Sequence, residues 1–419
     1  MKVLVIGAGP AGLNAACAAA ASGAHVTLLD QMPASGGRLW AGSTPLAVRD
    51  ALLARADRLG VQRLHAARVI AADGPALLVE PAGAPARWLA AQRLVLATGA
   101  RERQLPFPGW TLPGVVAAGG LQLMLKAGLS LRGRRVVIAG TGPLLLAAAD
   151  SARAAGAQVM LIAEQAPRKR VLRFAAGLHR HPDRLLQALR LRLALRRTPY
   201  RCGWRLVAAD AAGGVLGGVR LADARGTQHT IACDLLAISH GLLPELPLPT
   251  LLGCARGPRG VLTDTLCATS QPGIFAAGES TGIGGVAKAC LEGRIAGFAA
   301  AGRESEARAL GPALQRERAF AEALHQAFEP RREESPRPDD RTLLCRCEDV
   351  RWADVARCAD WREARLQTRC GMGHCQGRLC AAAAALLKGW SVDDVRPPFM
   401  PARAATLALL PVINPQETP

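Results

Sequence analysis

Cysteine residues gather near the end of the chain in two short stretches. LLCRCEDV spans residues 343–350 and TRCGMGHCQGRLC spans residues 368–380, and together they hold five of the twelve cysteines. The chain contains no C-x-x-C pair, which disfavours both dithiol exchange and the usual zinc knuckle. A C-x-C pair with further thiols nearby favours an iron–sulfur cluster, with zinc as the alternative.

Five thiols are available for the four ligand positions of a 2Fe–2S cluster. They are Cys345, Cys347, Cys370, Cys375 and Cys380. Cys345 and Cys347 form one predicted pair, because a loop can direct both thiolates of a C-x-C sequence to one metal centre. Cys375 and Cys380 would face different sides of a regular helix, so their use as a pair requires a turn, which Gly377 permits.

A glycine-rich turn stands at the other end of the chain, in the segment KVLVIGAGPAGL at residues 2–13. The apolar run 3–6 predicts a strand, residues 11–22 predict a helix, and HVTLLD at 25–30 predicts a second strand. In such a βαβ unit the G-x-G-x-x-G glycines allow a tight turn, close approach of a pyrophosphate and close packing of helix on strand. An acid that ends the second strand can accept ribose hydroxyl groups. The predicted dinucleotide-binding residues are Gly7, Gly9, Pro10, Ala11, Gly12 and Asp30.

Three later segments favour FAD over NAD as the dinucleotide. They are ASGGRLW at 34–40, LVLATGA at 94–100 and GIFAAGES at 273–280. With these segments the chain resembles the glutathione reductase-like flavoproteins, which contain two dinucleotide-binding domains. The resemblance implies that A-T-G lines the flavin domain and that the late Gly-acid pair faces the ribityl or pyrophosphate part of FAD. It adds the FAD-binding residues Gly37, Arg38, Ala97, Thr98, Gly99, Gly278 and Glu279.

A second βαβ unit follows at residues 134–164 and departs from the glycine pattern. Gly140 and Gly142 occupy the first two positions, but Leu145 stands at the third, where a side chain keeps the helix away from the strand and narrows the pocket. Glu164 ends the next strand and is acceptable as a partner for a ribose. We therefore predict a vestigial or repurposed pocket here in preference to a working NAD(P) site.

The cysteine-rich segment is similar to the 2Fe–2S module of bacterioferritin-associated ferredoxins. The same module ends the FAD-containing subunits of hydrogen cyanide synthase, opine oxidase and D-hydroxyproline dehydrogenase, and TGARERQLPFPGWTLPGV at 98–115 also resembles that family. Relatives often have a small residue without a thiol where Cys370 stands. The resemblance therefore assigns the ligands to Cys345, Cys347, Cys375 and Cys380, with Cys370 as the alternative.

The predicted fold is an α/β flavoprotein with two dinucleotide-binding domains and a small C-terminal iron–sulfur domain. A Pro-rich, charged stretch without periodicity, EPRREESPRPDDRT, predicts a linker. The stretch 168–197, rich in arginine and leucine, predicts a helix with a basic face. The expected layout is an FAD domain of residues 1–115 and 245–328, a second domain of 116–244, a linker of 329–342, a 2Fe–2S domain of 343–400 and a tail of 401–419.

The formal net charge of +19 comes almost entirely from arginines spread along the chain, and aromatic residues make up only 4%. Nucleic-acid binding is therefore not expected, because few rings are available to stack on bases. No apolar run reaches the length of about twenty residues that a membrane-spanning helix requires, and strand-forming residues follow Lys2 at once in place of a leader. We expect a cytoplasmic protein without direct membrane insertion, whose membrane association, if any, comes through its complex.

The resemblance implies the flavin and iron–sulfur subunit of a heteromeric amine or imino-acid dehydrogenase, which relays electrons from a donor such as D-hydroxyproline, an opine or glycine to an external acceptor. It implies a second FAD-dependent, oxidase-like subunit, room for a small third subunit, and a place for FMN at a subunit interface. No catalytic residue is predicted, because no acid–base pair can be placed near the flavin motifs and the nearest histidines, His240 and His374, are isolated. Two alternatives are a self-sufficient NAD(P)H-dependent reductase and a scaffold subunit that holds a nucleotide and a metal without turnover.

Overall fold

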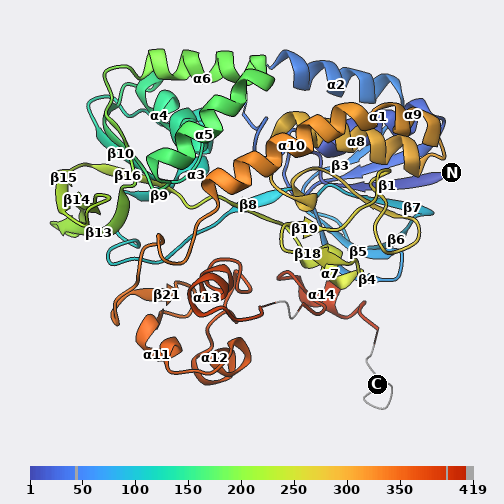
Figure 1. Ribbon diagram of the computed structural model, residues 1–419. Helices are drawn as coiled ribbons and strands as arrows, with labels where there is room; N and C mark the ends of the chain where they lie inside the picture. The colour runs from blue at the N-terminus through green and yellow to red at the C-terminus, as the bar shows by residue number, and fades with distance from the viewer. Residues whose placement is uncertain (43–45, 393–394, 412–419) are drawn as a thin grey trace.

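The computed structural model describes residues 1–42, 46–392 and 395–411 (Figure 1). Two parallel sheets of five strands each form the cores of two α/β halves, and a small cysteine-rich module lies beside them. The α/β fold with two parallel-sheet domains, predicted from the sequence, is confirmed. None of the helices in the described ranges is long and apolar enough to span a bilayer. Residues 412–419 of the expected tail and residues 393–394 of the expected 2Fe–2S domain lie outside the described residues.

The first half is built on a parallel sheet with the strand order β20-β7-β1-β2-β3. Its strands are short and mostly apolar, as expected for strands that are covered on both faces. They are β20 (Ile274–Ala276), β7 (Arg93–Leu96), β1 (Lys2–Ile6), β2 (His25–Leu29) and β3 (Gln62–Leu64). The helices on one face of this sheet and packed around it are α1 (Pro10–Ala21), α2 (Ala47–Arg58), α8 (Val286–Ala300), α9 (Glu304–Ala309) and α10 (Gly311–Phe328).

Glycines bring helices α1 and α8 close together. A Cβ atom on Gly293 would lie 2.1 Å from the Ala11 carbonyl oxygen, and one on Gly297 would lie 2.3 Å from the Ala15 carbonyl oxygen. Because no side chain fits into such a gap, α8 can pack here only with glycine at both positions. This contact fixes the start of α1, which carries the glycine-rich turn, against the segment that follows β20.

An antiparallel sheet covers the other face of the first half. Val3 and Val5 of β1 point to the helices, whereas Leu4 and Ile6 point to this second layer. The alternation follows from the period of two in a strand. The layer consists of β4 (Ala67–Asp73), β5 (Ala76–Pro81) and β6 (Arg87–Ala90), with α7 (Pro247–Leu251), β18 (Arg256–Gly257) and β19 (Gly260–Val261) nearby.

The second half has a parallel sheet with the strand order β12-β11-β10-β16-β9. Its strands are β12 (Tyr200–Cys202), β11 (Gln158–Glu164), β10 (Arg135–Gly140), β16 (Leu235–Ser239) and β9 (Val115–Ala117). A three-stranded antiparallel sheet packs against it, formed by β13 (Arg205–Ala212), β14 (Val215–Ala222) and β15 (Gln228–Ala232). Helices α3 (Ala118–Lys126) and α4 (Leu144–Ala154) cover the opposite face. The short antiparallel pair β8 (Ala100–Glu102) and β17 (Leu242–Pro244) lies where the chain crosses between the halves.

The basic stretch 168–197 forms two helices, so the prediction of a single helix is wrong. Helix α5 (Arg168–Gly177) is followed by a short 3-10 turn and then by α6 (Pro182–Ala194). The break falls at His181, whose backbone (φ −136°, ψ 74°) is not helical. The cause is Pro182, because a proline disfavours the helical conformation of the residue before it and is well suited to begin a helix.

The cysteine-rich module is a small compact unit below the two halves in Figure 1. It contains β21 (Leu343–Cys345), β22 (Val350–Arg351), α11 (Trp352–Ala356), α12 (Trp361–Thr368) and α13 (Cys380–Lys388). The buried side chains of Val355, Trp361 and Ala364 form its core together with the cysteines. Its entry is fixed to the second half, because the Trp110 indole N–H donates to the Leu343 carbonyl oxygen at 2.8 Å.

The stretch 329–342, expected as a linker, has no helix or strand but is attached to the body of the protein. Glu329 pairs with Arg103 at 2.8 Å, and Glu334 pairs with Arg170. Ser335 is buried. These contacts hold the stretch along the second half, so the segment that leads to the module is not a free linker.

The chain returns to the first half after the module. Short helix α14 (Ala404–Leu407) lies on the outer face of β4, β5 and β6, and the apolar residues of this segment cover Ile70 and Leu78. The buried Glu80 carboxylate fastens the segment, accepting hydrogen bonds from the Thr406 hydroxyl and from the Arg403 backbone N–H at 2.9 Å. Although burial alone would raise it, the bonds from Thr406, Arg403 and Arg68 lower the pKa of Glu80 to about 2.

Replacement of Glu80 by glutamine is expected to remove a stabilising contribution that depends on pH. The pKa of Glu80 falls from an ordinary 4.5 to about 2 on folding, so its contribution is complete above pH 4.5 and is lost as the pH falls towards 2. The difference between wild type and Glu80→Gln in free energy of unfolding should be on the order of 3 kcal/mol near neutral pH and should shrink below pH about 4. Urea unfolding from pH 7 to pH 3 measures it, and a pH-independent difference would contradict the prediction.

Candidate functional site

The turn between β1 and α1 is shaped by its three glycines. Gly7 has φ +104°, which favours glycine, and a Cβ atom there would lie 2.2 Å from the Ala97 carbonyl oxygen. A Cβ atom on Gly12 would lie 1.7 Å from the Gly7 carbonyl oxygen, so only glycine lets the helix start so close to the strand. The nearest atom to a Cβ on Gly9 would be Gly37 Cα, at 3.9 Å. At Gly7 and Gly12 the turn therefore packs closely against protein backbone, whereas at Gly9 there is space for another group.

The start of α1 is suited to an anion. No side chain caps the helix, and its first turn contains no acidic residue. Within the described residues, the backbone N–H groups of Ala11 and Gly12 have no protein acceptor. Free N–H groups and the helix dipole together favour negative charge, and this arrangement fits the pyrophosphate of a dinucleotide.

Asp30 lies beside this turn, just after β2. Its buried carboxylate accepts hydrogen bonds from the backbone N–H groups of Ala8 and of Met32, the latter at 2.7 Å. These bonds hold the carboxylate in place and leave lone pairs on both oxygens for hydroxyl donors. The position and chemistry fit the ribose role predicted for this residue.

Two further predicted segments lie next to the turn. Gly37 has φ +57°, and a Cβ atom there would lie 3.0 Å from Gly9 Cα, so the 34–40 loop approaches the turn closely. The Arg38 guanidinium donates to the Ala100 carbonyl oxygen at 3.2 Å, which joins this loop to the end of the 94–100 segment. Both segments thereby reach the carboxyl edge of the parallel sheet, where ligands of open α/β sheets bind.

The Gly278–Glu279 turn is anchored by a buried ion pair that the sequence analysis missed. The Lys288 ammonium lies 2.8 Å from the Glu292 carboxylate and donates to the Gly278 carbonyl oxygen at 3.0 Å, and Glu292 accepts from the Gly278 N–H at 3.0 Å. Both side chains are almost fully buried. Burial also raises the pKa of Glu279, and the charge of Lys288 opposes that rise. A Lys–Glu pair four residues apart is common on exposed helices, so its spacing alone does not reveal a buried clamp.

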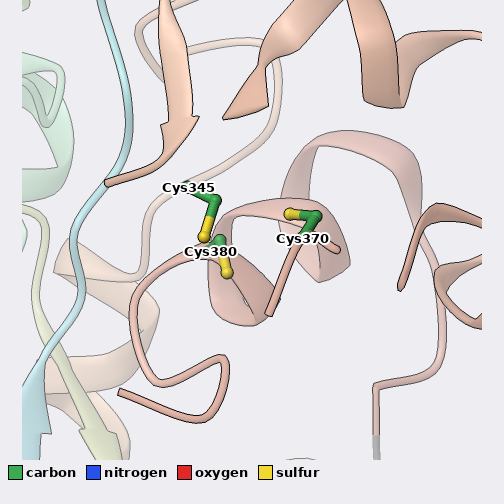
Figure 2. Close-up of side chains that lie close together, drawn as sticks. All are labelled: Cys345, Cys370 and Cys380. Carbon is green, nitrogen blue, oxygen red and sulfur yellow. The ribbon is translucent and has the colours of Figure 1, made fainter. Parts of the chain in front are cut away.

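Three buried thiols converge in the cysteine-rich module (Figure 2). The Sγ atoms of Cys345, Cys370 and Cys380 all lie within 4.8 Å of one another. The turn predicted before Cys380 is present, with positive φ angles at Gln376 (+53°) and Gly377 (+77°). This turn lets the thiol at the start of α13 face the thiol at the end of β21.

The other two thiols of the module lie near this group. Cys347 is exposed and Cys375 is partly buried, and the two are close enough to influence each other. The neighbouring Cys380 thiol, together with burial, raises the pKa of the Cys345 thiol. Among the described residues, the structure thus groups two of the predicted ligands, Cys345 and Cys380, with the alternative, Cys370, and leaves Cys347 and Cys375 outside this group of three.

Side chains of the protein itself lie at the turn of the second βαβ unit. Leu145 is fully buried between α4 and its sheet. The Thr141 hydroxyl donates to the Phe328 carbonyl oxygen at 3.0 Å, and the Phe328 side chain lies over Gly142. The Glu164 carboxylate is fully buried, and its oxygens accept from backbone N–H groups at 2.8 and 2.9 Å. Burial raises the pKa of Glu164 to about 7, which makes it a poor partner for a ribose.

The two histidines noted in the sequence differ in their surroundings. His240 is buried, and neither ring nitrogen has a hydrogen-bond partner in the described part of the structure. Burial, with a smaller effect of Arg103, lowers the pKa of His240 to about 3, so the ring is neutral. His374 is exposed in the loop between Cys370 and Cys375. Within the ranges that the structure describes, neither histidine is paired with a carboxylate, and neither is assigned a catalytic role.

Comparison with known proteins places these sites in a family. Residues 1–293 match the family model described as pyridine nucleotide-disulphide oxidoreductase. The chain belongs to this family. FAD-dependent oxidoreductase chemistry and FAD binding are supported for it by this match. The match covers all four flavin segments and the second βαβ unit at 134–164.

This oxidoreductase also resembles named subunits of known enzymes over most of its length. It is 34% identical to an opine oxidase subunit of Rhizobium meliloti, covering 95% of this chain and 96% of that one. It is 32% identical to hydrogen cyanide synthase subunit HcnB of Pseudomonas aeruginosa, covering 91% of each. The solved L-proline dehydrogenase from P. horikoshii is 19% identical and covers 97% of this chain and 79% of its own, with a TM-score of 0.61, which shows a shared fold. The family predicted from the motifs is confirmed.

NADH and NADPH are not expected to reduce the flavin of this oxidoreductase. Leu145 stands where a third glycine would let a dinucleotide approach, Phe328 lies beside Gly142, and the raised pKa of buried Glu164 makes it a poor acceptor for a ribose. Anaerobic addition of either nucleotide should leave the visible absorbance of the flavin unchanged, while dithionite bleaches it. Rapid bleaching by either nucleotide would show that the second βαβ unit binds it and would favour a self-sufficient reductase.

Proposed function

We propose that the protein is the flavin and iron–sulfur subunit of a heteromeric amine or imino-acid dehydrogenase. The observation that carries the proposal is a group of buried thiols beside a flavoprotein fold, joined to β8 by the hydrogen bond from Arg101 to the Arg378 carbonyl oxygen. Because Leu145 departs from the glycine pattern of a nicotinamide site, electrons would enter from a partner flavoprotein and would leave through the cluster to an external acceptor. When bound, FAD supplies two-electron chemistry and a 2Fe–2S cluster supplies one-electron transfer. Together they would allow electrons that arrive as a pair to leave one at a time.

The proposed FAD site joins the four segments at the carboxyl edge of the first sheet. The free N–H groups of Ala11 and Gly12 would bind the pyrophosphate, and Asp30 would accept from the ribose. Lys288 and Glu292 would keep the Gly278–Glu279 turn in place. The full proposed set is Gly7, Gly9, Pro10, Ala11, Gly12, Asp30, Gly37, Arg38, Ala97, Thr98, Gly99, Gly278 and Glu279.

The proposed cluster ligands are Cys345, Cys347, Cys375 and Cys380, with Cys370 as the alternative. Thiols must lose their protons to bind a metal, and the Cys345 thiol is buried and protonated when nothing is bound, so cluster assembly would release protons. Cys370 would then be a buried thiol beside the cluster. Four thiolates without a C-x-x-C knuckle favour a 2Fe–2S cluster over zinc.

The names of the relatives support the proposed substrates and partner. The opine oxidase relative and the hydrogen cyanide synthase relative HcnB are each named as one subunit of a larger enzyme. The proposed partner is a second FAD-dependent chain of the oxidase type that carries the amine-oxidising site, with room for a small third subunit.

Co-expression tests the proposed function. The chain should be produced alone and together with an oxidase-like flavoprotein encoded next to it, and dye reduction should be assayed with D-hydroxyproline, an opine, glycine and sarcosine. Turnover is expected only from the co-purified complex. Full turnover by the isolated chain, or a complex that reduces dye only with NADH, would overturn the proposal.

A further inference from the structure

Glu245 connects two segments of the protein. One is the turn at the end of the A-T-G segment, Thr98–Gly99, called here the flavin turn, and the other is the loop at 375–380 between two cysteines, called here the thiol loop. It follows β17, and its backbone N–H donates to the Gly99 carbonyl oxygen at 2.9 Å. In return the Thr98 hydroxyl donates to the Glu245 carbonyl oxygen at 2.8 Å. The backbone of Glu245 is thereby fastened on both sides to the turn at which the flavin segment ends.

The side chain of Glu245 reaches in the other direction, to two arginines. One carboxylate oxygen lies 3.0 Å from the Arg101 guanidinium, and the other lies 3.4 Å from the Arg378 guanidinium. Arg101 also donates to the Arg378 carbonyl oxygen at 3.2 Å. The carboxylate is only 20% exposed, so water screens these ion pairs less than it screens pairs on the surface.

Arg378 stands inside the thiol loop, three residues after Cys375 and two before Cys380. The three side chains thus bridge the flavin turn and the loop between two proposed cluster ligands. We propose that Glu245 is a positioning residue which, through Arg101 and Arg378, fixes the thiol loop against the flavin turn. The inference rests on the proposed function only for what is bound at the two ends, because the bridge itself is made by residues of this chain.

The bridge is separate from the contacts that attach the module as a whole. Trp110 holds Leu343 at the entry of the module, and Arg103 and Arg170 hold the preceding stretch. Loss of the Glu245 carboxylate should therefore leave the module attached and free only the loop around Arg378. This difference in location separates a positioning role from general destabilisation.

Hydrogen exchange of the purified full-length protein tests the inference. In Glu245→Gln, backbone amides of residues 376–380 should exchange at least about tenfold faster than in wild type, because bonds to a charged partner are lost. Amides of residues 343–345 should exchange at the wild-type rate. Arg378→Gln should reproduce the effect, the double variant should be no faster than either single variant, and Arg378→Lys should recover part of the protection. The matched control is Asp210→Asn, which removes an ion pair with Arg220 in the second half.

Unchanged exchange at 376–380 in both single variants would overturn the inference, and so would strictly additive effects in the double variant. Faster exchange at 343–345 would show general loosening of the module and would reject it as well. If Glu245→Gln fails to fold, the comparison of Arg378→Gln with Arg378→Lys still decides. Flavin, iron and sulfide content of the wild type are measured separately, so absence of cofactors would reject the proposed function while the exchange result still judges the bridge.

Discussion

Replacement of Cys347 by serine is expected to remove the iron–sulfur cluster from the purified protein. Cys347 is an exposed thiol near Cys375, and a serine hydroxyl is a poor substitute for a thiolate on iron. Anaerobically purified wild type should contain about two iron and two sulfide per chain, as in a single 2Fe–2S cluster, and Cys347→Ser should contain close to none. Metal analysis, sulfide assay and visible absorbance measure the loss.

The module offers a matched control at Cys358. That thiol is buried in the same small core but donates to the Asp354 carbonyl oxygen and stands outside the thiol group, so Cys358→Ser should keep the cluster. Cys370→Ser should also keep it. Loss in Cys370→Ser with retention in Cys375→Ser would show that Cys370 is the ligand, in line with the buried trio of thiols. Zinc in place of iron in anaerobic wild type would reject the cluster itself.

Replacement of Gly9 by alanine is expected to abolish tight FAD binding while leaving the protein folded. A Cβ atom at Gly9 would meet no protein atom closer than 3.9 Å, so the unliganded chain should tolerate it. The methyl group would instead occupy the space beside the free N–H groups of α1, where a pyrophosphate must approach the backbone. The variant should release no FAD on heating, and its unfolding temperature should lie within a few degrees of flavin-free wild type, on the order expected for a surface change.

Gly12 provides the contrast for this prediction. An alanine there would place its methyl group 1.7 Å from the Gly7 carbonyl oxygen, so Gly12→Ala should destabilise the fold itself. Flavin release by heat, followed by absorbance, quantifies binding in both variants, and thermal unfolding quantifies stability. A Gly9→Ala protein that retains stoichiometric FAD would reject the placement of the pyrophosphate at this turn.

Local patterns were sufficient for most of the parallel sheets. The order apolar strand, glycine turn, helix and second strand predicts β1, α1 and β2 closely, because each depends on residues near in sequence. The turn at Gly377 could be predicted for the same reason, since two thiols five positions apart cannot share a helical face. The stretch 168–197 shows the limit of local patterns. Its leucine spacing predicts one helix, but Pro182 keeps His181 out of the helical conformation and divides the stretch into two helices.

Contacts between distant parts of the chain could not be predicted. Glu80 and Arg403 are more than three hundred positions apart, and nothing near either residue indicates the other. The contact of Phe328 with the turn at Gly142 could not be predicted for the same reason, because the two residues are far apart in the sequence. The choice among five thiols depends on packing between β21, α13 and the intervening loop, which spacing alone leaves open.

The return of the chain to the first half after residue 395 affects how the protein can be shortened. A chain that stopped at residue 342 would lose more than its thiols, because Met400, Ala402 and Leu410 would no longer cover Ile70 and Leu78. The bared face is part of an open antiparallel sheet, which invites self-association. A flavin half without the module would therefore have to be made by excision, with the ends near residues 342 and 395 rejoined. A chain truncated at residue 342 should accordingly be insoluble, and should not be a soluble flavoprotein that only lacks iron.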